Sequence, residues 1–103
     1  MKWTLVRYQA KPDQADENQR LSAAVFKELQ EKTPGGLRYA VFRLPDDTFV
    51  HLASQEDGAA GLSTFQAFRA FSEGVRQRCI EPPLVAQPTV VGNYAMLTAT
   101  NKS

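Results

Sequence analysis

Four segments of the chain carry apolar, aromatic and β-branched residues in the pattern of β-strands. They are residues 2–10, 37–44, 48–53 and 84–97. The turn residues 45–47 join the second and third segments, so these two segments predict an antiparallel hairpin. Pro88 and Gly92 interrupt the last segment, because proline cannot donate to a sheet and glycine weakens a strand. We therefore expect the last strand in two pieces.

Two other segments repeat apolar residues at the spacing of an α-helix. The first helix begins near Asp13, whose carboxylate can accept hydrogen bonds from the free amides of the first turn. It ends before the Pro-Gly-Gly of residues 34–36, since proline removes a donor and glycine favours a left-handed cap. The second helix begins at residue 63 or 64 and continues to about Cys79, and Gly74 weakens it from inside.

The order of these elements is β-α-β-β-α-β, which is that of a ferredoxin-like α+β fold. We expect a four-stranded antiparallel sheet with both helices on one face. Both alternating sets of side chains are largely apolar in the predicted strands 37–44, 48–53 and 84–97. Two helices cover only one face of the sheet, so the other face needs a cover of its own. A second copy of the sheet provides it, which predicts a homodimer with two sheets face to face.

Length and composition indicate a single domain. The chain has 103 residues, of which 43% are hydrophobic and 22% are charged, and both fractions are ordinary for a globular protein. We find no internal repeat and no linker in the sequence. The expected organisation is one domain over residues 1–97 and a polar tail over residues 98–103.

Charge and cysteine content limit the partners that we expect. The net charge is only +1, whereas a nucleic-acid-binding module usually has a basic excess. An RNA-recognition module shares the element order, but its basic-aromatic signature is absent from the third strand, DTFVHLAS. No apolar run is long enough to span a bilayer, and the N-terminus meets a charge too soon for a signal peptide. The single cysteine indicates a reducing compartment, so we expect a cytoplasmic protein without nucleic-acid or membrane partners.

The charged candidates for chemistry lie within predicted strands. His51 is the only histidine, and its ordinary pKa of ~6.5 suits a general base or a donor to a phenol oxygen. The alternative is a core or interface histidine bonded to a carbonyl or a carboxylate. Arg7 and Arg43 have apolar neighbours and could orient an anionic or phenolate substrate. An ion pair at a sheet edge or interface is the favoured alternative for both arginines.

Aromatic residues form a second group of candidates. Trp3, Tyr39 and Tyr94 could supply flat walls and hydroxyl groups for an aromatic ligand, or simply belong to the core. Phe68 is one of three phenylalanines at every third position of the second helix, which could roof a pocket or pack as core. No metal site is expected, since one histidine, one cysteine and no clustered carboxylates make no ligand set.

Four features of the chain carry a family resemblance. They are the element order, the hairpin LRYAVFRLPDDTFVHLAS, the helix STFQAFRAF and the closing EPPLVAQPTVVGNY. With these features the chain resembles the antibiotic-biosynthesis-monooxygenase-like branch of the dimeric α+β barrel superfamily. The resemblance covers nearly the whole chain. It implies a homodimer with an eight-stranded barrel, and a pocket between sheet and helices in each subunit. Characterised members include cofactor-free oxygenases of polycyclic phenols, haem-degrading enzymes and isomerases.

The haem-degrading members use an Asn near the first strand, together with a Trp and a His. Here the first strand carries Trp3, Arg7 and Gln9 but no Asn, and the second helix contains no His or Trp. Haem degradation is therefore not expected for this chain.

The resemblance implies instead a cofactor-independent monooxygenase, with no cofactor, that acts on an aromatic or quinonoid small molecule. In this hypothesis His51 is the base and Arg7 stabilises the anion. The walls of the substrate site are Trp3, Tyr39, Tyr94 and Phe68. The alternative is a non-catalytic small-molecule-binding or structural homodimer of the same fold.

Overall fold

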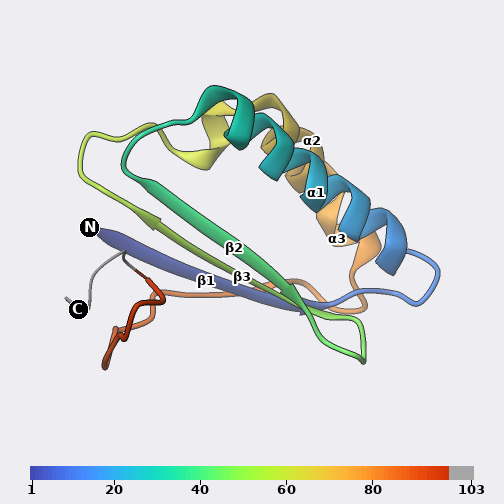
Figure 1. The fold of residues 1–103 in the computed structure, drawn as a ribbon. Helices are drawn as coiled ribbons and strands as arrows, with labels where there is room; N and C mark the ends of the chain where they lie inside the picture. The colour runs from blue at the N-terminus through green and yellow to red at the C-terminus, as the bar shows by residue number, and fades with distance from the viewer. Residues whose placement is uncertain (98–103) are drawn as a thin grey trace.

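In the computed structural model, which describes residues 1–97, four antiparallel strands form one sheet and the helices pack against one of its faces (Figure 1). The elements are β1 (Lys2–Gln9), α1 (Ala15–Lys32), β2 (Leu37–Arg43), β3 (Thr48–Gln55), the 3-10 helix η1 (Leu62–Thr64), α2 (Gln66–Glu73), α3 (Val75–Arg78) and β4 (Leu84–Ala86). Among these residues no helix is long and apolar enough to cross a membrane. The predicted ferredoxin-like α+β fold is confirmed, while the expected tail, residues 98–103, lies outside the described residues.

The strand register decides which side chains face the helices. The strand order is β2-β3-β1-β4, and Val6 of β1 and Val41 of β2 both lie opposite His51 of β3. Side chains alternate across a sheet, so His51, its two register partners and every second residue from them face the helices. On β1, Trp3 and Arg7 are an odd number of positions from Val6, so they lie on the face that no helix covers. We call this second face the outer face.

The core lies between the sheet and the helices. Val25 of α1 and Phe49 of β3 are the most deeply buried large apolar side chains, and Phe49 stacks on Tyr8 with 5.7 Å between ring centroids. Burial of a side chain of this size contributes about 1.5–3 kcal/mol to stability. Cys79 is also buried, and its thiol donates a hydrogen bond to the backbone carbonyl of Val75.

The second predicted helix is divided into η1, α2 and α3, with the second break at Gly74. The reason is the buried side chain of Arg78, which folds back toward this position. A Cβ atom on Gly74 would lie 2.9 Å from Nη1 of Arg78, which is closer than such atoms can approach. Glycine therefore leaves the space through which the guanidinium reaches the protein interior.

The last strand is shorter than predicted. The sequence pattern predicts strand structure over residues 84–97, but β4 ends at Ala86, and the following residues take no part in the sheet. Continued pairing would bring Pro88 next to Trp3, and proline has no amide hydrogen to donate to a ladder. The chain then leaves the sheet, and Val91 is 99% exposed.

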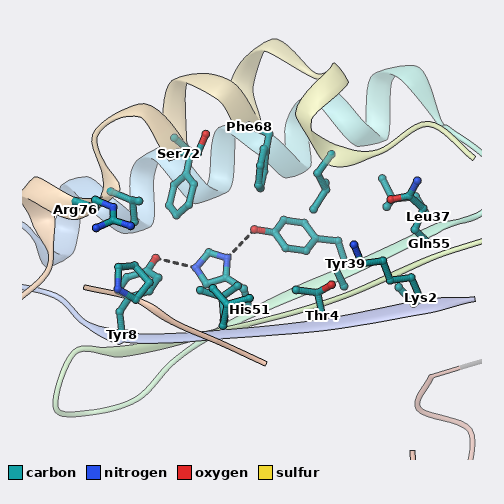
Figure 2. Close-up of a pocket in the computed structure, with 18 residues that line it drawn as sticks. Lys2, Thr4, Tyr8, Leu37, Tyr39, His51, Gln55, Phe68, Ser72 and Arg76 are labelled. Atoms are coloured by element: carbon teal, nitrogen blue, oxygen red, sulfur yellow. Dashed lines mark hydrogen bonds between the residues drawn. The ribbon is translucent and has the colours of Figure 1, made fainter. Parts of the chain in front are cut away.

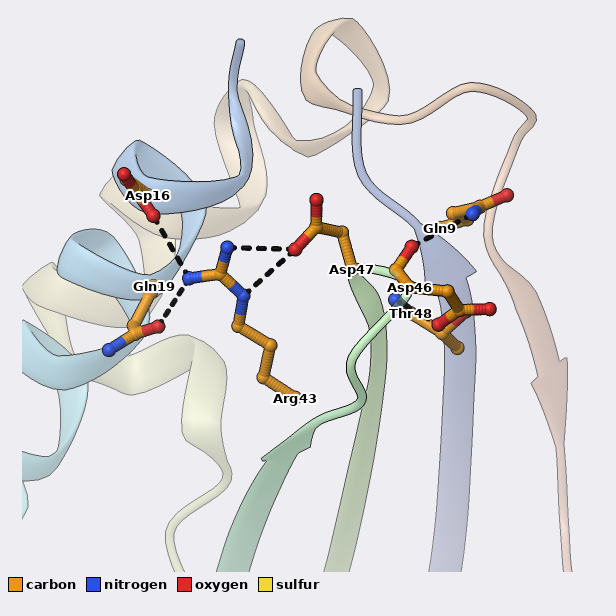
Figure 3. Close-up of polar contacts among 7 residues, drawn as sticks. All are labelled: Gln9, Asp16, Gln19, Arg43, Asp46, Asp47 and Thr48. Atoms are coloured by element: carbon orange, nitrogen blue, oxygen red, sulfur yellow. Dashed lines mark hydrogen bonds and ion pairs between the residues drawn. The ribbon is translucent and has the colours of Figure 1, made fainter. Parts of the chain in front are cut away.

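Polar contacts hold the β2–β3 hairpin against α1 (Figure 3). The guanidinium of Arg43 donates to the carboxylate of Asp47 at 2.8 Å and to that of Asp16 at 3.0 Å, and it also donates to Gln19. Asp46 caps the turn by accepting from the amide of Thr48. The ion-pair alternative for Arg43 is therefore confirmed, and this arginine positions the hairpin whose strands carry the candidate site.

Candidate functional site

A cavity of about 390 Å³ lies between the helix-facing side of the sheet and the helices above it (Figure 2). Alternate residues of β1, β2 and β3 form its floor. Apolar side chains of the helical segments form its roof: Leu62, Phe68, Phe71 and Val75. Pockets for small organic molecules have volumes of about 300–1,000 Å³ and mostly apolar walls. The volume and the lining are therefore those of a site for a small organic molecule.

His51 lies at the centre of the floor between two tyrosines (Figure 2). Its Nε2 atom is 2.7 Å from the hydroxyl oxygen of Tyr8, and its Nδ1 atom is 2.7 Å from the hydroxyl oxygen of Tyr39. The three residues stand on adjacent strands, Tyr8 on β1, His51 on β3 and Tyr39 on β2. Both ring nitrogens of His51 are thus hydrogen-bonded, one to each tyrosine hydroxyl, so neither nitrogen is free to bond directly to a molecule in the cavity.

The hydrogen bonds continue from Tyr8 into the protein interior. The side-chain amide of Asn18 donates to the Tyr8 hydroxyl at 2.8 Å, and Nε of Arg78 donates to Oδ1 of Asn18 at 2.9 Å. Arg78 also donates to the backbone carbonyl of Phe71 at 2.6 Å and lies over its ring. Asn18 is completely buried and Arg78 is 6% exposed. We call the chain Tyr39–His51–Tyr8–Asn18–Arg78 the relay.

Burial keeps the titratable members of the relay neutral, apart from its arginine. Desolvation lowers the pKa of His51 to about 4, so the imidazole is uncharged at neutral pH. Desolvation raises the pKa of Tyr8 to about 12, against a smaller lowering effect of the hydrogen bond from Asn18. Desolvation also raises the pKa of Tyr39. Both tyrosines therefore keep their hydroxyl hydrogens, and His51 is a weaker base than an ordinary histidine.

The charged residues around the cavity are all basic. Lys2 and Arg76 line it and are exposed, and Figure 2 shows them at opposite ends of the view. Neither forms an ion pair with another residue of the described part of the chain. No aspartate or glutamate is among the lining residues within 1–97. The electrostatic surroundings thus favour a ligand with negative charge.

The structure brings together half of the site residues expected from the sequence. Those that line the cavity are His51, Tyr39 and Phe68. Trp3 and Arg7 lie on the outer face, so they do not contact this cavity. Tyr94 was expected on the last strand, but it follows the end of β4 and is 74% exposed.

Three important residues of the site were missed by sequence reasoning. Tyr8 lies on the same face of the sheet as His51, but only the register between β1 and β3 shows this, and the strand pattern does not give that register. Asn18 lies on α1 seven residues before the buried Val25, and a polar residue on an apolar stripe is a signal of a buried network. Arg78 gave no such signal, because its burial depends on the break at Gly74.

Within residues 1–97 no three His, Cys, Asp or Glu side chains come close enough to hold a metal ion. The polar groups that face the cavity are hydroxyl, imidazole, amide and cationic groups. Their chemistry is donation of hydrogen bonds and stabilisation of negative charge on a bound molecule.

Comparisons with known proteins find similarity in structure but not in sequence. No family model matches the chain, and no curated protein matches it. Among solved structures, one named antibiotic biosynthesis monooxygenase matches 88% of this chain and 99% of its own, with a TM-score of 0.69 and 15% identity.

Two further solved structures give the same result. The Rv0793 protein of Mycobacterium tuberculosis has a TM-score of 0.68 at 13% identity, over 89% of this chain and 96% of its own. The PA3566 protein of Pseudomonas aeruginosa has a TM-score of 0.65 at 18% identity, over 88% and 95%. The chain therefore has the fold of the antibiotic-biosynthesis-monooxygenase-like proteins, as its sequence pattern led us to expect.

Proposed function

We propose that this protein is a cofactor-independent monooxygenase that acts on an aromatic or quinonoid small molecule. The observation that carries the proposal is the Tyr39–His51–Tyr8 arrangement at the floor of an aromatic-walled cavity. Phe68 and Phe71 line the cavity with aromatic rings, and Tyr39 offers a hydroxyl group to a substrate oxygen. The names of similar structures agree with this reaction class.

The reaction needs no cofactor when the substrate itself supplies the electrons. Anthrone, a three-ring ketone, illustrates the balance: its CH₂ group loses a proton to give an enolate, which reduces O₂. One oxygen atom becomes the new C=O group, and the other leaves as water with both hydrogens of the CH₂ group. The protein lowers the barrier by stabilising the enolate oxygen.

In this proposal Tyr39 is the catalytic residue, because it meets the substrate oxygen. His51 and Tyr8 are positioning residues that hold and polarise the Tyr39 hydroxyl. Two observations argue against His51 as the base that takes the substrate proton. Both of its ring nitrogens are already hydrogen-bonded, and burial lowers its pKa to about 4. We therefore assign the proton to solvent at the cavity mouth.

We also propose that the protein is a homodimer through the outer face. This face carries apolar side chains from all four strands, namely Trp3, Leu5, Phe42, Val50, Leu52 and Leu84. Phe42 is 50% exposed and Leu84 is 71% exposed in the single chain. An apolar surface of this kind is unfavourable in water, and a second copy of the sheet is a self-complementary cover. In this arrangement Trp3 serves the interface.

A non-catalytic binding protein is the second candidate. The observation that favours it is the absence of a strong base among the described residues of the cavity, since His51 is buried and neutral. Such a protein would bind an aromatic molecule in the same cavity and leave it unchanged.

Oxygen consumption with anthrone separates the two candidates. The protein, free of added metal or cofactor, is expected to accelerate O₂ uptake above the spontaneous rate and to place one ¹⁸O atom from ¹⁸O₂ in anthraquinone. Tyr39→Phe is expected to reduce the rate by about a hundred- to a thousandfold, in the range of a lost oxyanion donor. Tyr94→Phe is the matched control, because Tyr94 is exposed outside the cavity. Binding of anthrone without acceleration would establish the second candidate.

A further inference from the structure

Arg78 determines the orientation of its partner in the relay. A guanidinium has only donors, so the Asn18 atom that contacts Nε of Arg78 at 2.9 Å is the amide oxygen. The amide nitrogen of Asn18 then faces Tyr8 and donates to its hydroxyl oxygen. The direction of this first pair of hydrogen bonds follows from the chemistry of arginine alone.

The direction continues through the histidine. The hydroxyl of Tyr8 accepts from Asn18, and the one acceptor that it contacts within the described chain is Nε2 of His51, so we assign its hydrogen to that atom. A neutral imidazole that accepts at Nε2 carries its hydrogen on Nδ1. That hydrogen is donated to the hydroxyl oxygen of Tyr39, 2.7 Å away.

The hydroxyl hydrogen of Tyr39 is therefore left for the cavity. His51 is the only residue within 1–97 that bonds to this hydroxyl group, and there it is the donor. Each donor in such a chain polarises the next, so a charged group at one end strengthens donation at the other. The buried cation of Arg78 stands at the inner end, and Lys2 and Arg76 line the same cavity.

We propose that the cavity selects aromatic ligands that present a hydrogen-bond acceptor to Tyr39, and that it binds a phenolate in preference to the corresponding neutral phenol. The inference rests on the proposed function only in using the same cavity, since it requires binding and no turnover. The ligand class that follows is an aromatic ketone or an ionised phenol.

The test uses 4-nitro-1-naphthol, a two-ring phenol whose absorption spectrum changes when it ionises. Titration of the probe with and without protein, under nitrogen, gives its pKa in both states. We expect the bound probe to have a pKa lower by about one or more, which means that the phenolate binds about tenfold or more tightly than the phenol. An unchanged or raised pKa of the bound probe would overturn the inference.

Three variants locate the effect. Tyr39→Phe is expected to remove most of the phenolate preference, whereas Tyr94→Phe, the same change at an exposed tyrosine, leaves it intact. Arg76→Gln is expected to weaken the binding of the phenolate more than that of the phenol. Arg69→Gln is its control, because Arg69 is exposed on α2 and is not among the residues that line the cavity. Equal losses in Tyr39→Phe and Tyr94→Phe would contradict the assigned direction of the relay.

The sharpest variant is Asn18→Asp, which has nearly the same shape. A carboxylate at position 18 accepts from both Arg78 and Tyr8, so every later hydrogen bond of the relay reverses. Nε2 of His51 then donates to Tyr8, Nδ1 accepts from Tyr39, and Tyr39 accepts from the ligand. We expect the bound probe to prefer its neutral phenol form in this variant.

A double-mutant cycle separates this reversal from the direct repulsion by a new negative charge. If Asn18→Asp acts through the relay, it has little effect on the phenolate preference in the Tyr39→Phe background. An equal effect in both backgrounds would mean that the charge acts through space, and would overturn the relay argument. If anthrone is not oxidised while the phenolate preference is found, the proposed function fails and this inference stands.

Discussion

Gly74 and Arg78 depend on each other. Nη1 of Arg78 lies 2.9 Å from the position of a Cβ atom on residue 74, and the same guanidinium is anchored by Asn18 and by the carbonyl of Phe71. The guanidinium is thus held by two hydrogen bonds, one through Nε and one through Nη2, which oppose its displacement. The break in the helical segment and the buried end of the relay are two parts of one feature.

The substitution Gly74→Ala tests this dependence. The added methyl group displaces the anchored guanidinium, so we expect a loss of roughly 1–3 kcal/mol in the free energy of unfolding, measured by urea denaturation. Gly35→Ala is the control, since no atom lies within 4 Å of its added Cβ. Equal stability of the two variants would show that Arg78 relocates without cost.

Removal of the relay amide is expected to be more damaging. Asn18→Ala leaves the Nε donor of the buried Arg78 without its acceptor, and it removes a hydrogen bond from Tyr8. We expect a loss of roughly 2–4 kcal/mol in the free energy of unfolding. Gln30→Ala, an exposed position on the same helix, is expected to change it by less than about 0.5 kcal/mol. Similar values for both variants would rule out a structural role for the relay.

The lowered pKa of His51 predicts how stability depends on pH. The pKa is about 4 in the folded protein and near 6.5 in the unfolded chain, so the unfolded chain binds a proton first as the pH falls. Stability is therefore lost between about pH 6.5 and pH 4, by roughly 3 kcal/mol for this group. Urea denaturation across this range should show that the free energy of unfolding depends less on pH in His51→Gln than in the native protein. Parallel curves would show that His51 titrates normally.

Interruption of the outer face tests the proposed homodimer. Phe42→Lys places a charge on the apolar outer face, and a buried unpaired charge opposes association. We expect the native protein to sediment as a dimer at micromolar concentration and this variant to sediment as a monomer. Ala24→Lys, on the exposed side of α1, should remain a dimer. A monomeric native protein would remove the proposed interface.

Much of the fold follows from local sequence signals, but the site follows only in part. The alternation in residues 37–44 and 48–53 grouped Tyr39 with Val41, and His51 with Phe49, as the register confirms. The pattern alone could not say which group faces the helices, because a shift of one residue exchanges the two faces. Trp3 was therefore placed in a pocket, although it lies on the outer face.

The remaining differences come from tertiary contacts. The residues after Ala86 have strand composition, but pairing on that edge would require a donor from Pro88. Tyr94 therefore does not lie in the site where the sequence pattern predicts it. The role of Arg78 depends on its reach past Gly74 to Asn18, sixty positions away in the chain. No pattern of neighbouring residues reports such a contact.

Because Cys79 is buried, the reaction rate of the protein's single thiol reports how often the structure around it opens. A reagent such as an aromatic disulfide reacts with a thiolate that it can reach, and this thiol is both enclosed and bonded to Val75. Its burial also raises the pKa of the thiol. Cys79 directly follows Arg78, so its rate of labelling measures how often the inner end of the relay comes apart. A ligand that stabilises the relay should therefore slow the labelling of Cys79, and no engineered cysteine is needed to observe this.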